Sequence, residues 1–84
     1  MFDVSDQNPM ELGPQPLDAR LEELGLSNHD LVEASTEQIT HKMVTKGRKG
    51  RRLTANIQGK LLRALNAATG KKFELTQLFN YLGK

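Results

Sequence analysis

The residues best suited to chemistry in this 84-residue chain are the cations clustered between Gln38 and Arg52. The stretch reads QITHKMVTKGRKGRR and contains no acidic residue. Clustered cations bind phosphate oxygens, which supply much of the affinity of proteins for nucleic acids. The pattern therefore predicts a nucleic-acid contact surface, and the alternative is an ordinary solvated charged face. The predicted phosphate contacts are Lys42, Lys46, Arg48, Lys49, Arg51 and Arg52.

Short polar side chains accompany these cations. We predict a helix over residues 37–46, with Ile39 and Met43 on its packed side and Val44 mostly on the other, followed by a basic loop over residues 46–52. A helix of this length fits the major groove of duplex DNA, where hydroxyl, amide and imidazole groups reach base edges. The predicted base contacts are Thr36, Gln38, Thr40, His41 and Thr45.

Other groups of reactive side chains are less suited to chemistry. Ser27, His29 and Asp30 include the residue types of a hydrolase triad, but helix capping explains Ser27 and Asp30 without catalysis. Two histidines are too few for a metal site, and we expect His29 to form a surface pair with Glu33. The glycine spacing of GRKGRR does not match the phosphate loop of nucleotide hydrolases. We therefore expect no enzymatic activity, cofactor, metal or small-molecule substrate.

The charge of the chain is divided between its two parts. Residues 1–37 contain nine acidic residues and one cation, whereas residues 38–84 contain eleven Lys and Arg residues and one acid. Such a split predicts a positive binding side and an acidic segment that faces away from it or competes for it. Because the chain has no cysteine, no membrane-length apolar run and no signal-peptide pattern, we expect a cytoplasmic protein without a membrane partner.

The elements that position the basic stretch are expected to be helical. Residues 1–16 contain three prolines and no apolar period, so we predict a disordered arm there. Residues 17–84 are predicted to form one domain, an all-α bundle of about five helices with a helix-turn-helix-like unit. Its first helix ends at Gly25, and Ser27 begins the second with Asp30 in a capping box. The predicted core contains Leu21, Leu31, Ile39, Leu61, Leu65 and Leu78.

The C-terminal part is expected to supply the main core helix. Thr54 caps this helix and Gly70 ends it, while Gly59 predicts a close helix crossing. Thr76 is expected to begin a last helix, TQLFNYL. This helix offers a self-complementary patch for a possible homodimer, formed by Phe79, Tyr81 and Leu82.

The order of these elements resembles the lambda-repressor-like, or XRE/Cro-type, helix-turn-helix domains of phage and bacterial regulators. The resemblance covers residues 17–79. It rests on LDARLEELGLSNHDLVEAS, which is similar to the family's first two helices, and on RRLTANIQGKLLRALN and ELTQLF, which are similar to its fourth and fifth. The chain departs from the family in a shortened segment from Leu31 to Ile39, in Ser35 and Thr36 at the turn, and in a lengthened segment from Ile39 to Thr54. The resemblance implies a DNA-binding transcriptional regulator whose recognition helix is Thr36 to Thr45, with backbone contacts after it.

The residues leave two other non-enzymatic functions open. One is a protein–protein interaction adaptor that uses the basic loop on an acidic partner. The other is a structured-RNA binder that recognises shape. No aromatic residue is interleaved with the cations of residues 38–52, as it would be in a platform for single-stranded nucleic acid. We therefore expect double-stranded DNA as the partner.

Overall fold

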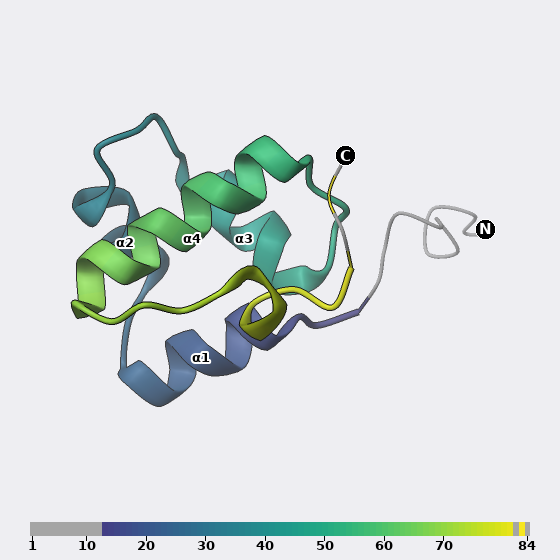
Figure 1. The fold of residues 1–84 in the computed structure, drawn as a ribbon, viewed down its shortest axis with the longest axis horizontal. Helices are drawn as coiled ribbons and strands as arrows, with labels where there is room; N and C mark the ends of the chain where they lie inside the picture. The colour runs from purple at the N-terminus through teal and green to yellow at the C-terminus, as the bar shows by residue number, and fades with distance from the viewer. Residues whose placement is uncertain (1–12, 82, 84) are drawn as a thin grey trace.

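A computed structural model of the protein describes residues 13–81 and residue 83. Within these residues the chain forms four α-helices and one short 3-10 helix, and it contains no β-strand. The elements, shown in Figure 1, are α1 (Pro16–Leu24), α2 (Asn28–Ala34), α3 (His41–Lys49), α4 (Ala55–Thr69) and η2 (Leu75–Gln77). The predicted all-α fold is confirmed, with four α-helices rather than about five.

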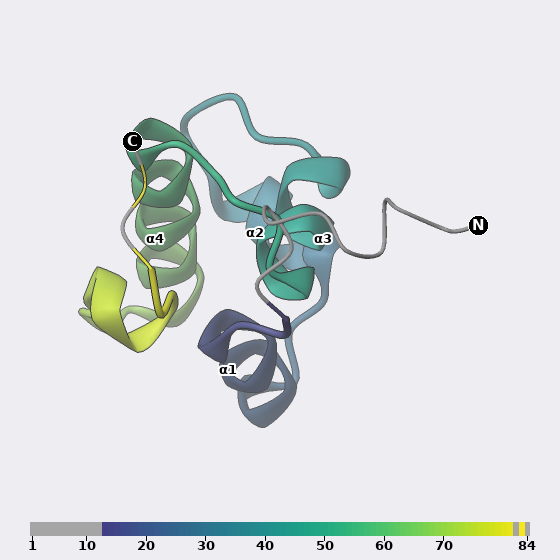
Figure 2. The same ribbon diagram turned by 90° about the vertical axis from the view of Figure 1, so that its right-hand side faces the viewer.

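The helices enclose one apolar core. α4 packs against α2, and α3 contacts α1, α2 and α4. Figures 1 and 2 show η2 and the chain after it beside both α4 and α1, where the Leu17 amide donates to the Leu78 carbonyl. All six predicted core residues are buried. The complete core is formed by Leu17, Leu21, Leu31, Ile39, Val44, Leu53, Leu61, Ala64, Leu65, Leu78 and Phe79.

Most helix ends lie where the sequence predicted them. α1 ends at Gly25, which has a left-handed backbone. Ser27 and Asp30 form the predicted capping box of α2. The Thr54 hydroxyl accepts from the Ile57 amide at the start of α4, and Gly70 ends that helix. Local capping rules predicted these boundaries because each involves residues that are close in the sequence.

The boundaries of α3 were predicted wrongly. Its first residue is His41 rather than Glu37, because the Ser35 hydroxyl bonds both the amide and the carbonyl of Glu37 in a turn. The N-cap is Thr40, whose hydroxyl accepts from the Met43 amide at 3.1 Å. The helix also continues to Lys49, so residues 46–49 are helical and do not belong to a loop.

The shift of α3 changes which of its faces is buried. Ile39 precedes the helix, so its spacing from Met43 does not define a helical face. The buried positions of α3 are instead Val44 and Gly47, one turn apart. A Cβ atom at Gly47 would lie 3.0 Å from Leu61 Cδ1, with Leu53 and Leu17 also close. The close approach predicted at Gly59 thus occurs at Gly47, and the atoms nearest to a Cβ at Gly59 belong to the Arg63 guanidinium rather than to the core.

The two ends of the described chain also differ from the prediction. Most of the predicted disordered arm lies outside the described residues, but residues 13–16 belong to the folded domain. Gln15 is 2% exposed, and its amide donates to the Arg48 carbonyl. At the other end, the predicted last helix is reduced to the single turn of η2. Phe79 is buried and Leu82 lies outside the described residues, so the homodimer patch expected from Phe79, Tyr81 and Leu82 stays a prediction.

Candidate nucleic-acid interface

One face of α3 carries an exposed row of lysines. Lys42, Lys46 and Lys49 are all exposed and lie at positions i, i+4 and i+7, which share one side of a helix. The helix contains no acidic residue. Its buried residues, Val44 and Gly47, hold the opposite side against the core. We call Lys42, Lys46 and Lys49 the α3 lysine row. The core therefore fixes the orientation of this row relative to the rest of the domain.

Two further cations extend the positive charge beyond α3. Gly50, with φ +94°, ends the helix, and its α-carbon lies so close to the Gly13 backbone that any side chain would collide with it. Arg51 and Arg52 follow and are exposed. The Arg52 guanidinium lies 5.2 Å from the centre of the Tyr81 ring, whose hydroxyl accepts from the Leu53 amide. This segment is thus held to the domain by tertiary contacts.

Arg48 does not share the exposure of the other cations. Its Nε donates to Asp18 Oδ1 at 2.5 Å and its Nη2 to Glu22 Oε2 at 3.2 Å. Its Nη1 donates to Asn28 Oδ1 at 2.8 Å, and the side chain is 19% exposed. Arg48 therefore links α3 to α1 and α2, and its guanidinium is directed into the domain. We remove it from the set of candidate phosphate contacts.

The predicted base contacts fall into two groups. His41 is exposed at the first position of α3, and Thr45 is half-buried one turn later, beside the α3 lysine row. Thr36 and Gln38 are exposed but lie before the helix, in the segment of residues 35–40. Thr40 caps α3 with its hydroxyl. The structure therefore brings His41 and Thr45 together with the lysines and leaves the other three candidates on the approach to the helix.

The segment before α3 is anchored by an ion pair with α4. Arg63 Nε donates to Glu37 Oε2 at 2.6 Å, and its Nη2 donates to Glu37 Oε1 at 2.8 Å. These hydrogen bonds lower the pKa of Glu37 and raise the pKa of Arg63 from their ordinary values. The anchor was not predicted, because its partners are 26 residues apart and the sequence contains no local signal that joins them.

The two histidines meet where α2 and α3 begin. The His29 and His41 rings contact edge to face, with centroids 5.5 Å apart. His29 Nε2 also lies 3.8 Å from Glu33 Oε2, which is the predicted surface pair. Ser27 and Asp30 bond to each other in the capping box. No group of three or more potential metal ligands occurs among the described residues.

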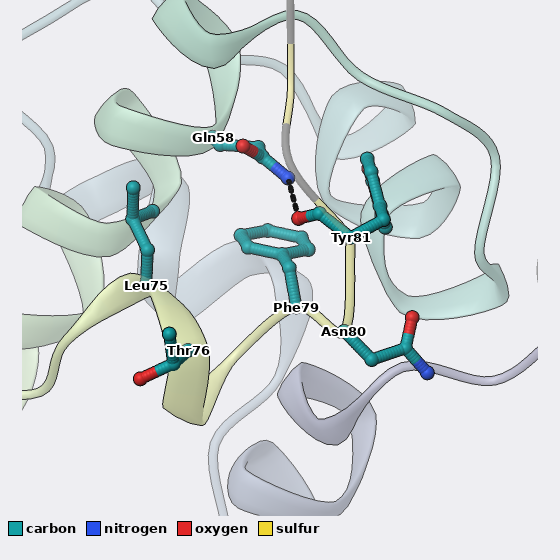
Figure 3. Close-up of a pocket in the computed structure, with 6 residues that line it drawn as sticks. All are labelled: Gln58, Leu75, Thr76, Phe79, Asn80 and Tyr81. Carbon is teal, nitrogen blue, oxygen red and sulfur yellow. Dashed lines mark hydrogen bonds between the residues drawn. The ribbon is translucent and has the colours of Figure 1, made fainter.

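Two hollows in the surface of the described residues differ in the side chains that line them. The larger, of about 310 Å³, lies between α4 and the C-terminal segment (Figure 3). Figure 3 shows the Phe79 ring between Leu75 and Gln58, with Gln58 bonded to the Tyr81 carbonyl. The residues that line it include no acid, histidine or cysteine: Gln58, Leu75, Thr76, Phe79, Asn80 and Tyr81. The smaller hollow, of about 230 Å³, is lined by residues with polar or charged side chains: Asp18, Asn28, Thr45, Arg48 and Lys49.

Comparison with protein-family models, curated proteins and solved structures finds no match to this chain. Among the described residues, no helix has the length and apolar character needed to cross a membrane.

Proposed function

We propose that this protein binds duplex DNA as a transcriptional regulator and places the exposed side of α3 in the major groove. The observation that carries this proposal is the α3 lysine row, on a helix that contains no acid and whose opposite side is buried in the core. A charged face on a mobile loop would be an ordinary solvated surface. A row of cations held rigidly on one helix is a surface with a defined shape.

The dimensions of α3 suit the groove. A helix of nine residues is about 13 Å long at ~1.5 Å per residue, and the major groove is about 12 Å wide. The long lysine side chains at the two ends of the row reach outward to phosphates. The shorter side chains of His41 and Thr45, beside the row, are directed at base edges. Phosphate contacts would provide affinity and base contacts specificity.

Internal pairing reduces the repulsion that acidic side chains would exert on DNA. Asp18 and Glu22 on α1 bind Arg48, and Glu37 before α3 binds Arg63. Each of these carboxylates therefore lies against a cation, and Arg48 is shared between Asp18 and Glu22. Within the part of the chain that the structure describes, the α3 lysine row takes part in no ion pair, which supports attraction of phosphates.

The two alternatives make different predictions for the same titration. Fluorescence anisotropy would compare a labelled DNA duplex, an RNA hairpin and a polyglutamate chain at several salt concentrations. We expect the duplex to bind most tightly, with log affinity falling against log salt by ~0.9 for each phosphate contacted. Preference for the hairpin would support the RNA binder. Binding of polyglutamate alone would support the adaptor for acidic partners, and either result would overturn the proposal.

A further inference from the structure

Five side chains connect α1, α2 and α3 through a chain of hydrogen bonds. Arg48, held by Asp18 and Glu22, donates from Nη1 to Asn28 Oδ1 at 2.8 Å. Asn28 Nδ2 in turn donates to Thr45 Oγ1, also at 2.8 Å. Thr45 therefore lies at the end of a polar chain that begins at a paired guanidinium.

The direction of this chain is fixed by the chemistry of Arg48. A guanidinium can only donate hydrogen bonds, so the side-chain atom of Asn28 that faces it must be the carbonyl oxygen. The amide nitrogen of Asn28 is then turned toward Thr45, and it can only donate. Consequently the Thr45 oxygen accepts a hydrogen bond on the side of Asn28, and its own hydrogen must be directed elsewhere.

The hydroxyl hydrogen of Thr45 has no acceptor within the described part of the chain. A threonine in a helix often donates to the carbonyl four residues earlier, as Thr69 does to Leu65 at 2.9 Å. The Thr45 hydroxyl makes no such bond, and its one hydrogen bond with the described residues is the one it accepts from Asn28. Thr45 lines the smaller hollow together with Lys49, so its side chain borders space that a ligand can enter.

We propose that Asn28 positions Thr45 as a hydrogen-bond donor to a purine N7 in the major groove. The inference rests on the proposed binding of duplex DNA. In that groove N7 is an acceptor on both adenine and guanine, whereas cytosine presents an N4 amino donor. Thr45 lies between Lys42 and Lys49 along α3, and these longer side chains contact the phosphates on either side. Thr45 is the specificity-determining residue, and Asn28 is a positioning residue that does not touch DNA.

The first test locates the acceptor. A preferred duplex is selected from a pool with a randomised centre, and each purine in it is then replaced in turn by its 7-deaza analogue, which lacks N7. For the wild-type protein we expect one position at which the replacement weakens binding about 5- to 30-fold. Thr45→Val keeps the shape of the side chain without its hydroxyl. This variant should bind the unmodified duplex as weakly as the wild type binds the 7-deaza duplex. Introducing the 7-deaza base at that position should not lower the affinity of the variant further.

The second test reverses the direction of the bond. Asn28→Asp replaces the amide with a carboxylate that only accepts, so Thr45 would donate to residue 28 and present its lone pairs to the DNA. The preferred base at that position should change from one with an acceptor to one with an amino donor, such as cytosine. The added negative charge lowers the affinity for every duplex alike. The measured quantity is therefore the ratio of the affinities for duplexes that differ at that position. In a Thr45→Val background, Asn28→Asp should leave the ratio unchanged.

The outcomes separate the two proposals. If no duplex binds in a salt-dependent manner, both proposals are wrong. If the wild type selects a preferred duplex but no 7-deaza position depends on Thr45, DNA binding stands and the inference about Thr45 is wrong. A loss that appears instead with a neutral methylphosphonate at one phosphate would identify a backbone contact, and it would also overturn the inference. Circular dichroism melting of each variant confirms that it is folded.

Discussion

At the scale of single residues, Arg48 and Lys46 differ sharply although they are two positions apart in α3. Arg48 is bound by Asp18, Glu22 and Asn28, while Lys46 is exposed on the lysine row. Arg48→Ala should lower the free energy of unfolding by about 1–2 kcal/mol, because it leaves Asn28 Oδ1 and the carboxylates of Asp18 and Glu22 without their partner. Urea denaturation measures this change, and an unaltered midpoint would show that the ion pairs contribute nothing.

Lys46→Ala is expected to have the opposite profile. Its denaturation midpoint should remain close to that of the wild type, since its side chain is exposed and forms no ion pair with any other described residue. Its duplex affinity should decrease, and the slope of log affinity against log salt should become smaller in magnitude by ~1. A slope equal to that of the wild type would exclude Lys46 as a phosphate contact.

The sequence predicted the cations as a group but could not distinguish them. All six carry the same positive charge, and only the fold shows that Arg48 faces α1. Asp18 and Glu22 lie one turn apart and together form a site that attracts a cation, but the partner is 26 residues or more away along the chain. The chain that joins Arg48, Asn28 and Thr45 was missed for the same reason.

At the scale of elements, the two helical glycines provide a matched test of packing. A Cβ at Gly47 would lie 3.0 Å from Leu61 Cδ1 in a filled core, whereas the atom nearest to a Cβ at Gly59 is Nη1 of the exposed Arg63 side chain, which can move outward by a few tenths of an ångström. Gly59→Ala should therefore stabilise the protein by about 0.5–1 kcal/mol through helix propensity. Gly47→Ala should destabilise the protein, because overpacking the core typically costs ~1–3 kcal/mol. This cost is larger than the gain in helix propensity that the same substitution brings. Thermal melts of the two variants that shifted in the same direction would contradict this account of the α3–α4 contact.

The capping box of α2 predicts a dependence on pH. The Ser27 amide donates to Asp30 Oδ2 at 2.7 Å, and this bond, together with one from the Ser27 hydroxyl, lowers the pKa of Asp30. Because the folded carboxyl has the lower pKa, its stabilisation is present above the unfolded pKa and is lost as pH falls through the folded one. The Tm of Asp30→Ala should be lower than that of the wild type at pH 7, and the difference should shrink as pH falls below the unfolded pKa of about 3.9. A difference that did not vary with pH would point to a loss of packing instead.

The start of α3 shows why some elements were predictable and this one was not. Ser35, Thr36 and Thr40 are all residue types that cap helices, so local rules allow several starting points. The Ser35–Glu37 turn and the Glu37–Arg63 ion pair select the latest of them. The sequences of α1, α2 and α4 each place a capping residue next to a single apolar period. Their boundaries were therefore predicted within a residue or two.

At the scale of the whole molecule, stability should depend on the leucines of α4. Leu61 and Leu65 are completely buried at the centre of the core, as the apolar period of the sequence predicted. Leu65→Ala should cost ~2–5 kcal/mol, a large part of the stability of a small domain. Leu62→Ala, at a half-buried position of the same helix, should cost less. Equal denaturation midpoints for the two variants would contradict the core described here.

The binding surface can be tested at the same scale by comparing two variants that each lose two lysines, at different places on the domain. Lys71 and Lys72 are exposed and follow the C-terminal end of α4, at the other end of that helix from the loop that joins it to α3 (Figure 1). A variant without these lysines has the same net charge as one without Lys46 and Lys49. Comparing these two variants therefore distinguishes binding at a local surface from a general attraction of DNA to the positive charge of the protein.

The measurement that tests the central claim most directly is the salt dependence of duplex DNA binding by these two double variants. Anisotropy titrations would start at about 50 mM salt and tens of micromolar protein, where even non-specific affinities of ~10⁻⁴–10⁻⁶ M are detectable. We predict that Lys46→Ala with Lys49→Ala reduces the magnitude of the salt slope by about 2, and that Lys71→Ala with Lys72→Ala leaves it near the wild-type value. Equal slopes for the two variants, or no salt-dependent binding by the wild-type protein, would contradict the assignment of α3 as the DNA-binding surface.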